Sequence, residues 1–211
     1  MSYYPKGKGI FCLEGDWWGI RDTTTVETML QFIQKSGRVP IPYIHRDIGT
    51  FFEFRYYMWK WTQQAQKDHP ILYLAFHGIP GGVYVGDKRK SDSLVSLETM
   101  GELLKGKCRR RIIVIGSCET LAVSPARIHK FLKTTRAAAV CGYRKEVEWV
   151  TSAALEIILL STMQQNEFTI AGAKSIKNRM KKMVPSLISE LQFSMIVRKD
   201  QTRRKQEKHN F

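Results

Sequence analysis

The chain has 211 residues, of which 43% are hydrophobic and 25% are charged, and these fractions are ordinary for a globular protein. No apolar run approaches the roughly 20 residues that a membrane-spanning helix requires. The amino terminus has neither the apolar stretch nor the small-residue cleavage site of a secretory signal. We therefore expect a cytoplasmic protein without a membrane partner, in which residues 1–198 form one domain and residues 199–211 form a basic, disordered tail.

The formal net charge is +15, and Lys and Arg are concentrated in residues 105–111 and 174–208. Such an excess is often a sign of nucleic-acid binding, although basic runs frequently do no more than keep a protein in solution. A regulatory protein or a nucleic acid, bound through the basic C-terminal segment, is the partner that this charge suggests. The four cysteines form no CxxC pair and are too few for a disulfide scaffold, so we expect neither a metal nor another cofactor.

The first part of the chain alternates short apolar runs with helical patterns. Residues 10–14 lie between glycines and predict a buried strand. Thr and Asp side chains at 22–25 predict the cap of a helix that runs to about Lys35 and ends at Gly37. Residues 39–44 predict an edge strand, because Pro40 and Pro42 cannot donate hydrogen bonds to a central ladder.

The segment 51–67 is rich in aromatic residues at helical spacing. Phe52, Tyr56 and Trp59 fall on one stripe of the predicted helix, together with Gln63. A stripe of this kind usually faces the core. We therefore expect these aromatic side chains to be buried rather than to form a ligand site.

The pattern continues through the rest of the domain. Residues 70–76, 111–115 and 137–141 predict further strands, and residues 80–85 predict a turn followed by the returning strand of a hairpin. Helices are expected around 97–104, at 125–133 and at 152–164, and a basic amphipathic helix at 171–183 is expected to end the domain. This alternation predicts an α/β fold with a mostly parallel central sheet covered on both faces.

Two of the predicted strands end in reactive side chains. The strand at 70–76 leads into His77-Gly78, and the strand at 111–115 leads through Gly116-Ser117 into Cys118. If these strands are parallel neighbours, both side chains emerge at the same carboxyl edge of the sheet, where α/β proteins bind ligands. A histidine beside a cysteine can activate the thiol as a nucleophile, and the Gly78 and Cys118 amides could hold a developing oxyanion.

The strings YLAFHG, IIVIGSC and VCGYRKEVEWVTSAALEIILL resemble the caspase-like cysteine peptidases, and most of all the bacterial CHAT group, which is related to the separases. The similarity covers about residues 9–161. It implies a caspase-like three-layer α/β/α fold, with His77 as general acid/base, Cys118 as nucleophile, and Gly78 with the Cys118 amide as the oxyanion hole. The order of the two residues supports the resemblance. In this chain His77 precedes Cys118, whereas glutaminases and related hydrolases place the nucleophile before the histidine.

One position departs from the pattern of the CHAT group, and the residue after which a substrate would be cut has to be inferred separately. Thr120 stands where many CHAT proteins have glycine, two residues after the cysteine. Relatives commonly cut after basic residues, which require carboxylates in the substrate pocket. We expect this preference here, with Asp16, Glu146 and Glu148 as the substrate-binding residues.

The sequence therefore predicts a cysteine endopeptidase that uses a His–Cys dyad on a protein substrate, with bacterial antiphage defence or cell death as its setting. Two alternatives stay open. One is a basic nucleic-acid-binding or scaffold protein on the same fold, without catalysis, for which the net charge is the main argument. The other is a cysteine-dependent amidase that acts on small amides.

Overall fold

The protein is built around one six-stranded sheet. The structure, a computed structural model, describes residues 7–19, 21–36, 39–90 and 93–200. Five neighbouring strands are parallel, and the last one, at an edge, is antiparallel to its neighbour. In spatial order the strands are β2 (Tyr43–Asp47), β1 (Ile10–Glu14), β3 (Ile71–Ala75), β7 (Ile112–Ile115), β8 (Ala139–Tyr143) and β9 (Phe193–Val197).

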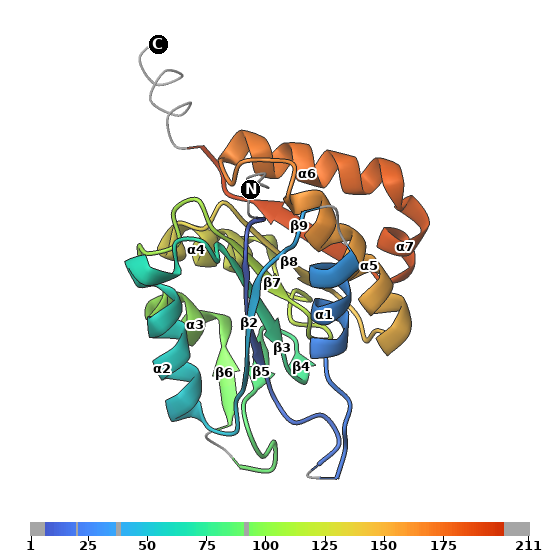
Figure 1. Ribbon diagram of the computed structural model, residues 1–211. Helices are drawn as coiled ribbons and strands as arrows, with labels where there is room; N and C mark the ends of the chain where they lie inside the picture. The colour runs from blue at the N-terminus through green and yellow to red at the C-terminus, as the bar shows by residue number, and fades with distance from the viewer. Residues whose placement is uncertain (1–6, 20, 37–38, 91–92, 201–211) are drawn as a thin grey trace, which may run out of the picture.

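Helices cover both faces of this sheet, as Figure 1 shows. One face carries α2 (Phe51–Trp61), α3 (Leu97–Leu103) and α4 (Pro125–Thr135), and a short 3-10 helix (Gln64–Gln66) follows α2. The other face carries α1 (Glu27–Ser36), α5 (Trp149–Met163), α6 (Ile170–Met183) and α7 (Pro185–Glu190). The predicted three-layer α/β/α architecture with a mostly parallel sheet is therefore confirmed.

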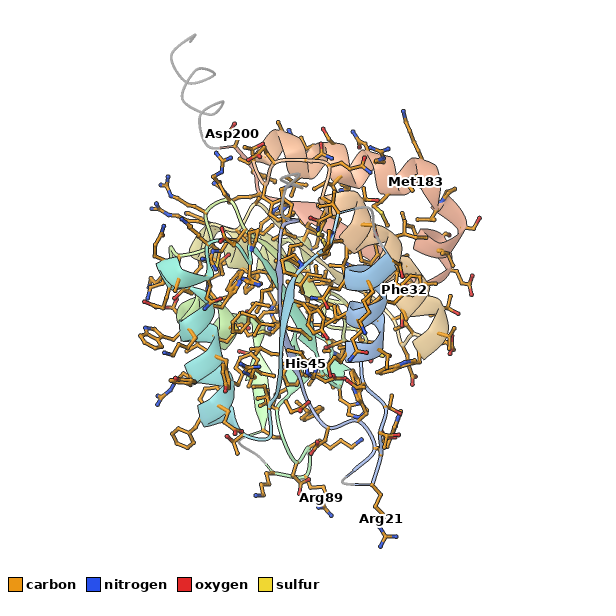
Figure 2. All side chains as sticks on the ribbon, viewed as in Figure 1. Arg21, Phe32, His45, Arg89, Met183 and Asp200 are labelled. Atoms are coloured by element: carbon orange, nitrogen blue, oxygen red, sulfur yellow. The ribbon has the colours of Figure 1, made fainter. Side chains whose placement is uncertain are left out.

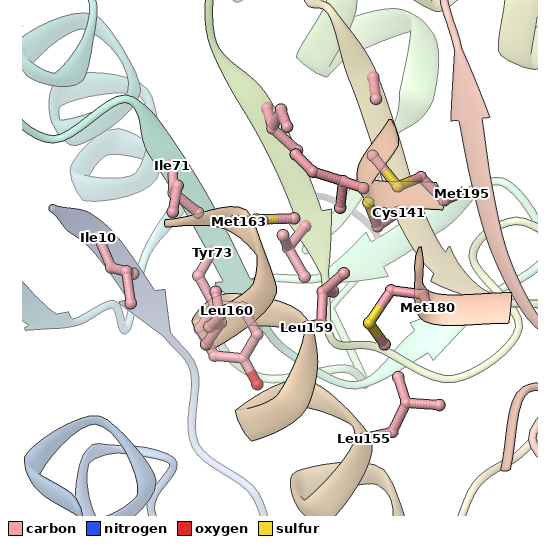
Figure 3. Packing of buried hydrophobic residues seen from close by; sticks show 14 of the residues in the cluster. Ile10, Ile71, Tyr73, Cys141, Leu155, Leu159, Leu160, Met163, Met180 and Met195 are labelled. Carbon is pink, nitrogen blue, oxygen red and sulfur yellow. The ribbon is translucent and has the colours of Figure 1, made fainter. Parts of the chain in front are cut away.

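The central strands are apolar along their whole length because helices bury them from both sides. Every residue of β1, β3, β7 and β8 is buried. On the α5 side, Figure 3 shows Leu155, Leu159 and Leu160 of the helix among the side chains of the sheet. None of the helices in the described ranges combines the length and the apolar character needed to cross a membrane.

A small antiparallel sheet follows β3 directly. It consists of β4 (Gly78–Ile79), β5 (Gly82–Tyr84) and β6 (Leu94–Ser96), in that order. The turn between β4 and β5 contains Gly81, whose φ of +83° is easy for glycine and strained for other residues. The hairpin expected after His77 is thus present, and it begins at Gly78.

The carboxyl-terminal part differs from the prediction. The basic helix expected at 171–183 is present as α6, but it does not end the domain, because α7 and β9 follow it. The run FSMIV is short and follows a helix directly, so its strand character becomes evident only through its pairing with β8. The predicted stop at Gly37 and the tail beyond Asp200 lie outside the described residues.

The predicted burial of the aromatic stripe on α2 is wrong. Phe52, Tyr56 and Trp59 are 72%, 49% and 47% exposed, whereas Phe54 and Trp61 are fully buried, together with Met58. The buried side chains have the same i, i+4, i+7 spacing as the predicted stripe, shifted by two residues. Because aromatic residues occur all around this helix, spacing alone could not select the face that packs on the sheet.

Candidate active site

The strands that carry His77 and Cys118 are parallel neighbours. β3 pairs with β7 in parallel, with Leu74 opposite Ile115, so both chains leave the sheet at the same edge. The order of strands reverses between β1 and β3, which makes this edge the place where open α/β sheets bind ligands. The juxtaposition predicted from the sequence is therefore present.

The two turns at this edge are in direct contact. A Cβ atom added to Gly78 would lie 2.0 Å from the carbonyl oxygen of Cys118 and 2.9 Å from the Cβ atom of Ser117. The Phe76 N–H donates to Ser117 Oγ at 3.2 Å, and Ser117 is fully buried. Only glycine fits at position 78, because any side chain would push the turn that carries Cys118 away.

Thr120, which stands where many CHAT proteins have glycine, lies in the turn after Cys118. The left-handed residue of this turn is Glu119, with a φ of +55°, and its N–H donates to the carbonyl oxygen of Lys145 at 3.1 Å. Thr120 is buried, and its hydroxyl donates to the carbonyl oxygens of Gly82 and Cys118 at 3.3 and 3.2 Å. Threonine at position 120 thus fastens the turn to β5, and a glycine is not required there.

His77 is held by the loop that follows β1. Its Nε2 atom lies 2.5 Å from the carbonyl oxygen of Trp17, and its ring meets the rings of Trp17 and Trp18 edge-on at 5.4 and 5.2 Å. A carbonyl oxygen can only accept a hydrogen bond, so Nε2 must carry the proton. In the neutral ring, Nδ1 is then the unprotonated nitrogen and the atom able to take a proton from a thiol.

Cys118 is the one cysteine of the four that is not buried. Partial burial raises the pKa of its thiol above the usual value, and the charges of Glu146 and Glu119 raise it further, against a backbone hydrogen bond at Val147. Burial also raises the pKa of the other three thiols, that of Cys108 to about 12. The Cys118 thiol is therefore protonated at neutral pH and needs a base to become a nucleophile.

His77 and Cys118 line the same pocket, which has a volume of about 100 Å³ and is called the edge pocket below. Its walls are largely apolar and aromatic, with Trp17 and Trp149 in T-shaped contact at 4.7 Å. Further members of the lining are Met29, Phe76 and Gly116. A mostly apolar pocket with a few convergent polar groups is the usual form of a ligand site.

Glu156 lines the edge pocket and was not among the predicted site residues. Its carboxyl group accepts hydrogen bonds from the Tyr73 hydroxyl at 2.5 Å and the Tyr143 hydroxyl at 2.9 Å. Burial raises its pKa to about 7, against the two tyrosine hydrogen bonds. The signal that could have revealed it is a single acid inside the apolar helix segment AALEIILL, which is costly unless the acid is partnered or used.

The carboxylates predicted to bind substrate lie elsewhere. Asp16, Glu146 and Glu148 are exposed, and none of them lines the edge pocket. The Glu148 carboxylate caps α5 by accepting from the N–H groups of Val150 and Thr151 at 2.9 and 2.7 Å. Glu146 acts on Cys118 through its charge. Their role in substrate binding stays a prediction.

A buried carboxylate fixes the loop that carries Trp17. Glu14, at the end of β1, accepts hydrogen bonds from Trp17 Nε1, the Val26 N–H and the Thr25 hydroxyl at 2.6, 2.8 and 2.7 Å. His45 Nε2 lies 2.7 Å from the same carboxylate. Burial lowers the pKa of His45, but the hydrogen bond to Glu14 and its charge outweigh burial and raise it overall.

Glu14 and His45, with Asp47, are also the described residues whose donor atoms could converge on a metal ion, all within 4.8 Å of one another. Four hydrogen bonds already occupy the Glu14 carboxylate, and one of them comes from His45. The cluster is explained by its hydrogen bonds, which tie the loop after β1 to β2.

The chain belongs to a protein family of unknown function, DUF6642, whose model matches residues 7–196. The match includes every strand of the sheet except the last residue of β9, and every residue of the edge pocket. No curated protein matches the chain.

Proposed function

We propose that the protein is a cysteine endopeptidase of the caspase-like kind, in which His77 and Cys118 form the catalytic dyad. The observation that carries this proposal is the presence of both side chains in one pocket, with His77 held so that Nδ1 is its free nitrogen. The resemblance of the two strand ends to the CHAT group supports the same assignment. A cytoplasmic location and a role in bacterial defence or cell death belong to the proposal through that resemblance alone.

The reaction begins when His77 Nδ1 takes the proton of the Cys118 thiol. The thiolate attacks the carbonyl carbon of the scissile peptide bond, and the carbonyl oxygen becomes an oxyanion. His77 then gives its proton to the leaving amine, and an acyl-enzyme thioester remains. Water, deprotonated by His77, hydrolyses the thioester and restores the thiol.

In this mechanism the N–H groups of Gly78 and Cys118 serve as oxyanion donors, and the strand pairing supports this role for Gly78. The Tyr84 N–H donates to the carbonyl oxygen of His77 at 2.8 Å, so His77 and Tyr84 form a hydrogen-bonded pair of the β4–β5 ladder. Because such pairs alternate in antiparallel strands, the N–H of Gly78, opposite Val83, is directed away from β5. Donors of this kind typically contribute about 10²–10³-fold to the rate.

The edge pocket suits the side chain of a basic residue that precedes the cleaved bond. Trp17 and Trp149 offer aromatic faces to an aliphatic stem or a guanidinium group, and Glu156 offers an acid among the lining residues. A cation that enters would favour the ionised form of Glu156, whose pKa lies near 7. The cost of burying that charge would then be offset by the pairing.

The test is the cleavage of a library of internally quenched peptides by the wild type, Cys118→Ala and His77→Ala. We expect cleavage after Arg or Lys by the wild type and a loss of at least about 10³-fold in both variants. A set of small amides run beside the library identifies a cysteine amidase instead. Equal cleavage by the wild type and Cys118→Ala would refute the assignment.

Labelling with iodoacetamide tests the thiol independently of the substrate. Cys118 should be alkylated faster than Cys12, Cys108 and Cys141, which are all buried. The His77→Ala variant should slow the labelling of Cys118 at neutral pH without affecting the other three thiols.

A further inference from the structure

A groove lined by cations lies at the edge of the sheet opposite Cys118. It forms where the chain enters β7 and β8 and leaves β9, beside the carboxyl-terminal end of α4. In Figure 2, Asp200, which belongs to its lining, lies at the end of the molecule opposite Arg21 and Arg89. The groove, called the basic groove below, has a volume of about 720 Å³ and is lined by Arg109, Lys130, Lys133, Arg136, Arg198 and Lys199.

These six cations are poorly balanced by acids. Asp200 is the one acidic residue in the lining. Among the described residues, the ion pairs of Lys and Arg employ other cations, namely Arg89, Lys105, Arg110 and Arg127. The pKa of His129, which also lines the groove, is lowered first by burial and then by the charge of Lys199. The fold therefore gathers like charges in a concave surface, where they reinforce one positive potential.

The helix dipole explains only part of this arrangement. Lys133 and Arg136 lie at the carboxyl-terminal end of α4, where cations are favourable. Arg109 precedes β7, and Arg198 and Lys199 follow β9, so these three cations converge from separate parts of the chain. Their convergence requires an explanation beyond the stabilisation of one helix.

The chemistry of the lining selects the kind of anion. Among the described residues of the groove, none is Trp, Tyr, Phe or an aliphatic residue. An acidic peptide usually depends on apolar anchors for its affinity, and a single-stranded nucleic acid depends on aromatic side chains for base stacking. A duplex offers one charge per about 1.7 Å of its axis, which suits a surface that provides cations alone. The guanidinium groups can also hold phosphates with paired hydrogen bonds.

We propose that the basic groove binds the phosphate backbone of a double-stranded nucleic acid without reading its base sequence. The groove and the edge pocket lie at opposite edges of the sheet, so the binding leaves Cys118 accessible. The inference does not depend on the peptidase assignment, since it rests on the charges of the groove.

Fluorescence anisotropy with a labelled 20-base-pair DNA duplex of arbitrary sequence tests the proposal. We expect micromolar binding by the full-length protein at low salt, with a slope of about −3.5 to −5.5 in a plot of log K against log salt, for about four to six phosphates. The variant Lys130→Glu/Lys133→Glu/Arg136→Glu should bind at least about tenfold more weakly and show a shallower slope. Cys118→Ala should bind as the wild type does.

The matched control is Lys174→Glu/Lys181→Glu/Lys182→Glu, which makes the same change of charge on the exposed face of α6. It should retain affinity within about threefold. Equal losses in both variants would show attraction by net charge alone and would overturn the groove assignment. A loss of affinity confined to a third variant, Arg203→Ala/Arg204→Ala/Lys205→Ala, would show that the carboxyl-terminal segment binds the duplex. This result would also overturn the groove assignment.

Two further binding measurements identify the chemical class of the partner. A duplex RNA of the same sequence distinguishes RNA from DNA as the source of the phosphates, and binding to either supports the proposal. Displacement of the duplex by polyglutamate at equal charge concentration would assign the groove to acidic polypeptides and refute it. If thermal melting shows that the charge-reversal variant is unfolded, Lys133→Ala/Lys199→Ala replaces it, with an expected loss of about fivefold.

Discussion

The carbonyl oxygen of Trp17 determines which nitrogen of His77 carries a proton, and with it which nitrogen would act on Cys118 in the proposed dyad. The hydrogen bond that fixes the tautomer comes from the main chain, and the Trp17 and Trp18 rings pack against the histidine edge-on. The position of that carbonyl depends in turn on Glu14, which holds the Trp17 indole and the amide of Val26. At the scale of single residues, the site is a chain of hydrogen bonds that leads from a buried carboxylate to the histidine.

The charge near the thiol should be measurable through its reactivity. Because Glu146 raises the pKa of Cys118, Glu146→Gln should lower that pKa and speed alkylation at pH 7.5 about twofold. The measurement is the rate of iodoacetamide labelling from pH 6 to 10, with the labelled cysteine identified by mass spectrometry.

The control for this measurement is Glu148→Gln. Its carboxylate caps α5 and does not contribute to the raised pKa of Cys118, so the labelling profile should keep its midpoint. A midpoint that moves equally in both variants would contradict the role of Glu146.

At the scale of elements, α2 carries two aromatic stripes, of which one is buried and the other is exposed. The inner stripe contains Phe54 and Trp61, which are buried, and the outer stripe contains Phe52, Tyr56 and Trp59. Lys60 lies over the rings of Tyr56 and Trp59 at 5.3 and 5.2 Å, a contact that exposed rings can make.

Substitutions on the two stripes should therefore differ in cost. Phe54→Ala should reduce the free energy of unfolding by about 3–5 kcal/mol, because it leaves a cavity between α2 and the sheet. Phe52→Ala should change it by less than about 1 kcal/mol. Urea unfolding followed by circular dichroism measures both, and a similar loss in the two variants would show that the outer stripe is covered.

The sequence predicted those elements best whose environment is uniform. The strands β1, β3 and β7 are buried on both sides, so their apolar runs could be read directly, and with them the meeting of His77 and Cys118. The burial of α2 could not be predicted from spacing, because both of its stripes are aromatic. The role of Trp17 was also hidden, since its contribution is a main-chain oxygen that any residue could offer. Glu156 was missed because its burial depends on hydrogen bonds from two tyrosines, Tyr73 and Tyr143, which the sequence does not show to be its neighbours.

At the scale of the whole molecule, two buried acids, Glu14 and Glu156, and the half-buried His45 make stability depend on pH. Burial raises the pKa of Glu14, but its hydrogen bonds, led by that of His45, outweigh burial and lower it overall. The stability from Glu14 is therefore present above its unfolded pKa and is lost as the pH falls through the lower folded value. The pKa of His45 is raised, so its contribution is complete below about 6.5 and is lost as the pH rises through the folded value.

Glu156 adds a loss that runs from its unfolded pKa of 4.5 to its folded pKa of about 7, because over this range the unfolded chain ionises first. We expect the free energy of unfolding to be greatest near about pH 5 and to decline from there towards pH 8, first through Glu156 and then through His45. Urea unfolding across this range measures it. Glu156→Gln should flatten the decline, whatever its effect on absolute stability, and an unchanged slope would contradict this account.

The contact between Gly78 and Cys118 has a mechanical consequence. Hydrogen bonds join the His77 carbonyl to Tyr84, the Thr120 carbonyl to Gly81, and the Thr120 hydroxyl to Gly82, so β5 ties both turns together. The turns that carry His77 and Cys118, the proposed base and nucleophile, are thereby joined and should move together. Any change in the width of the edge pocket is therefore more easily made by the loop that carries Trp17, which lines the pocket, than by the two joined turns.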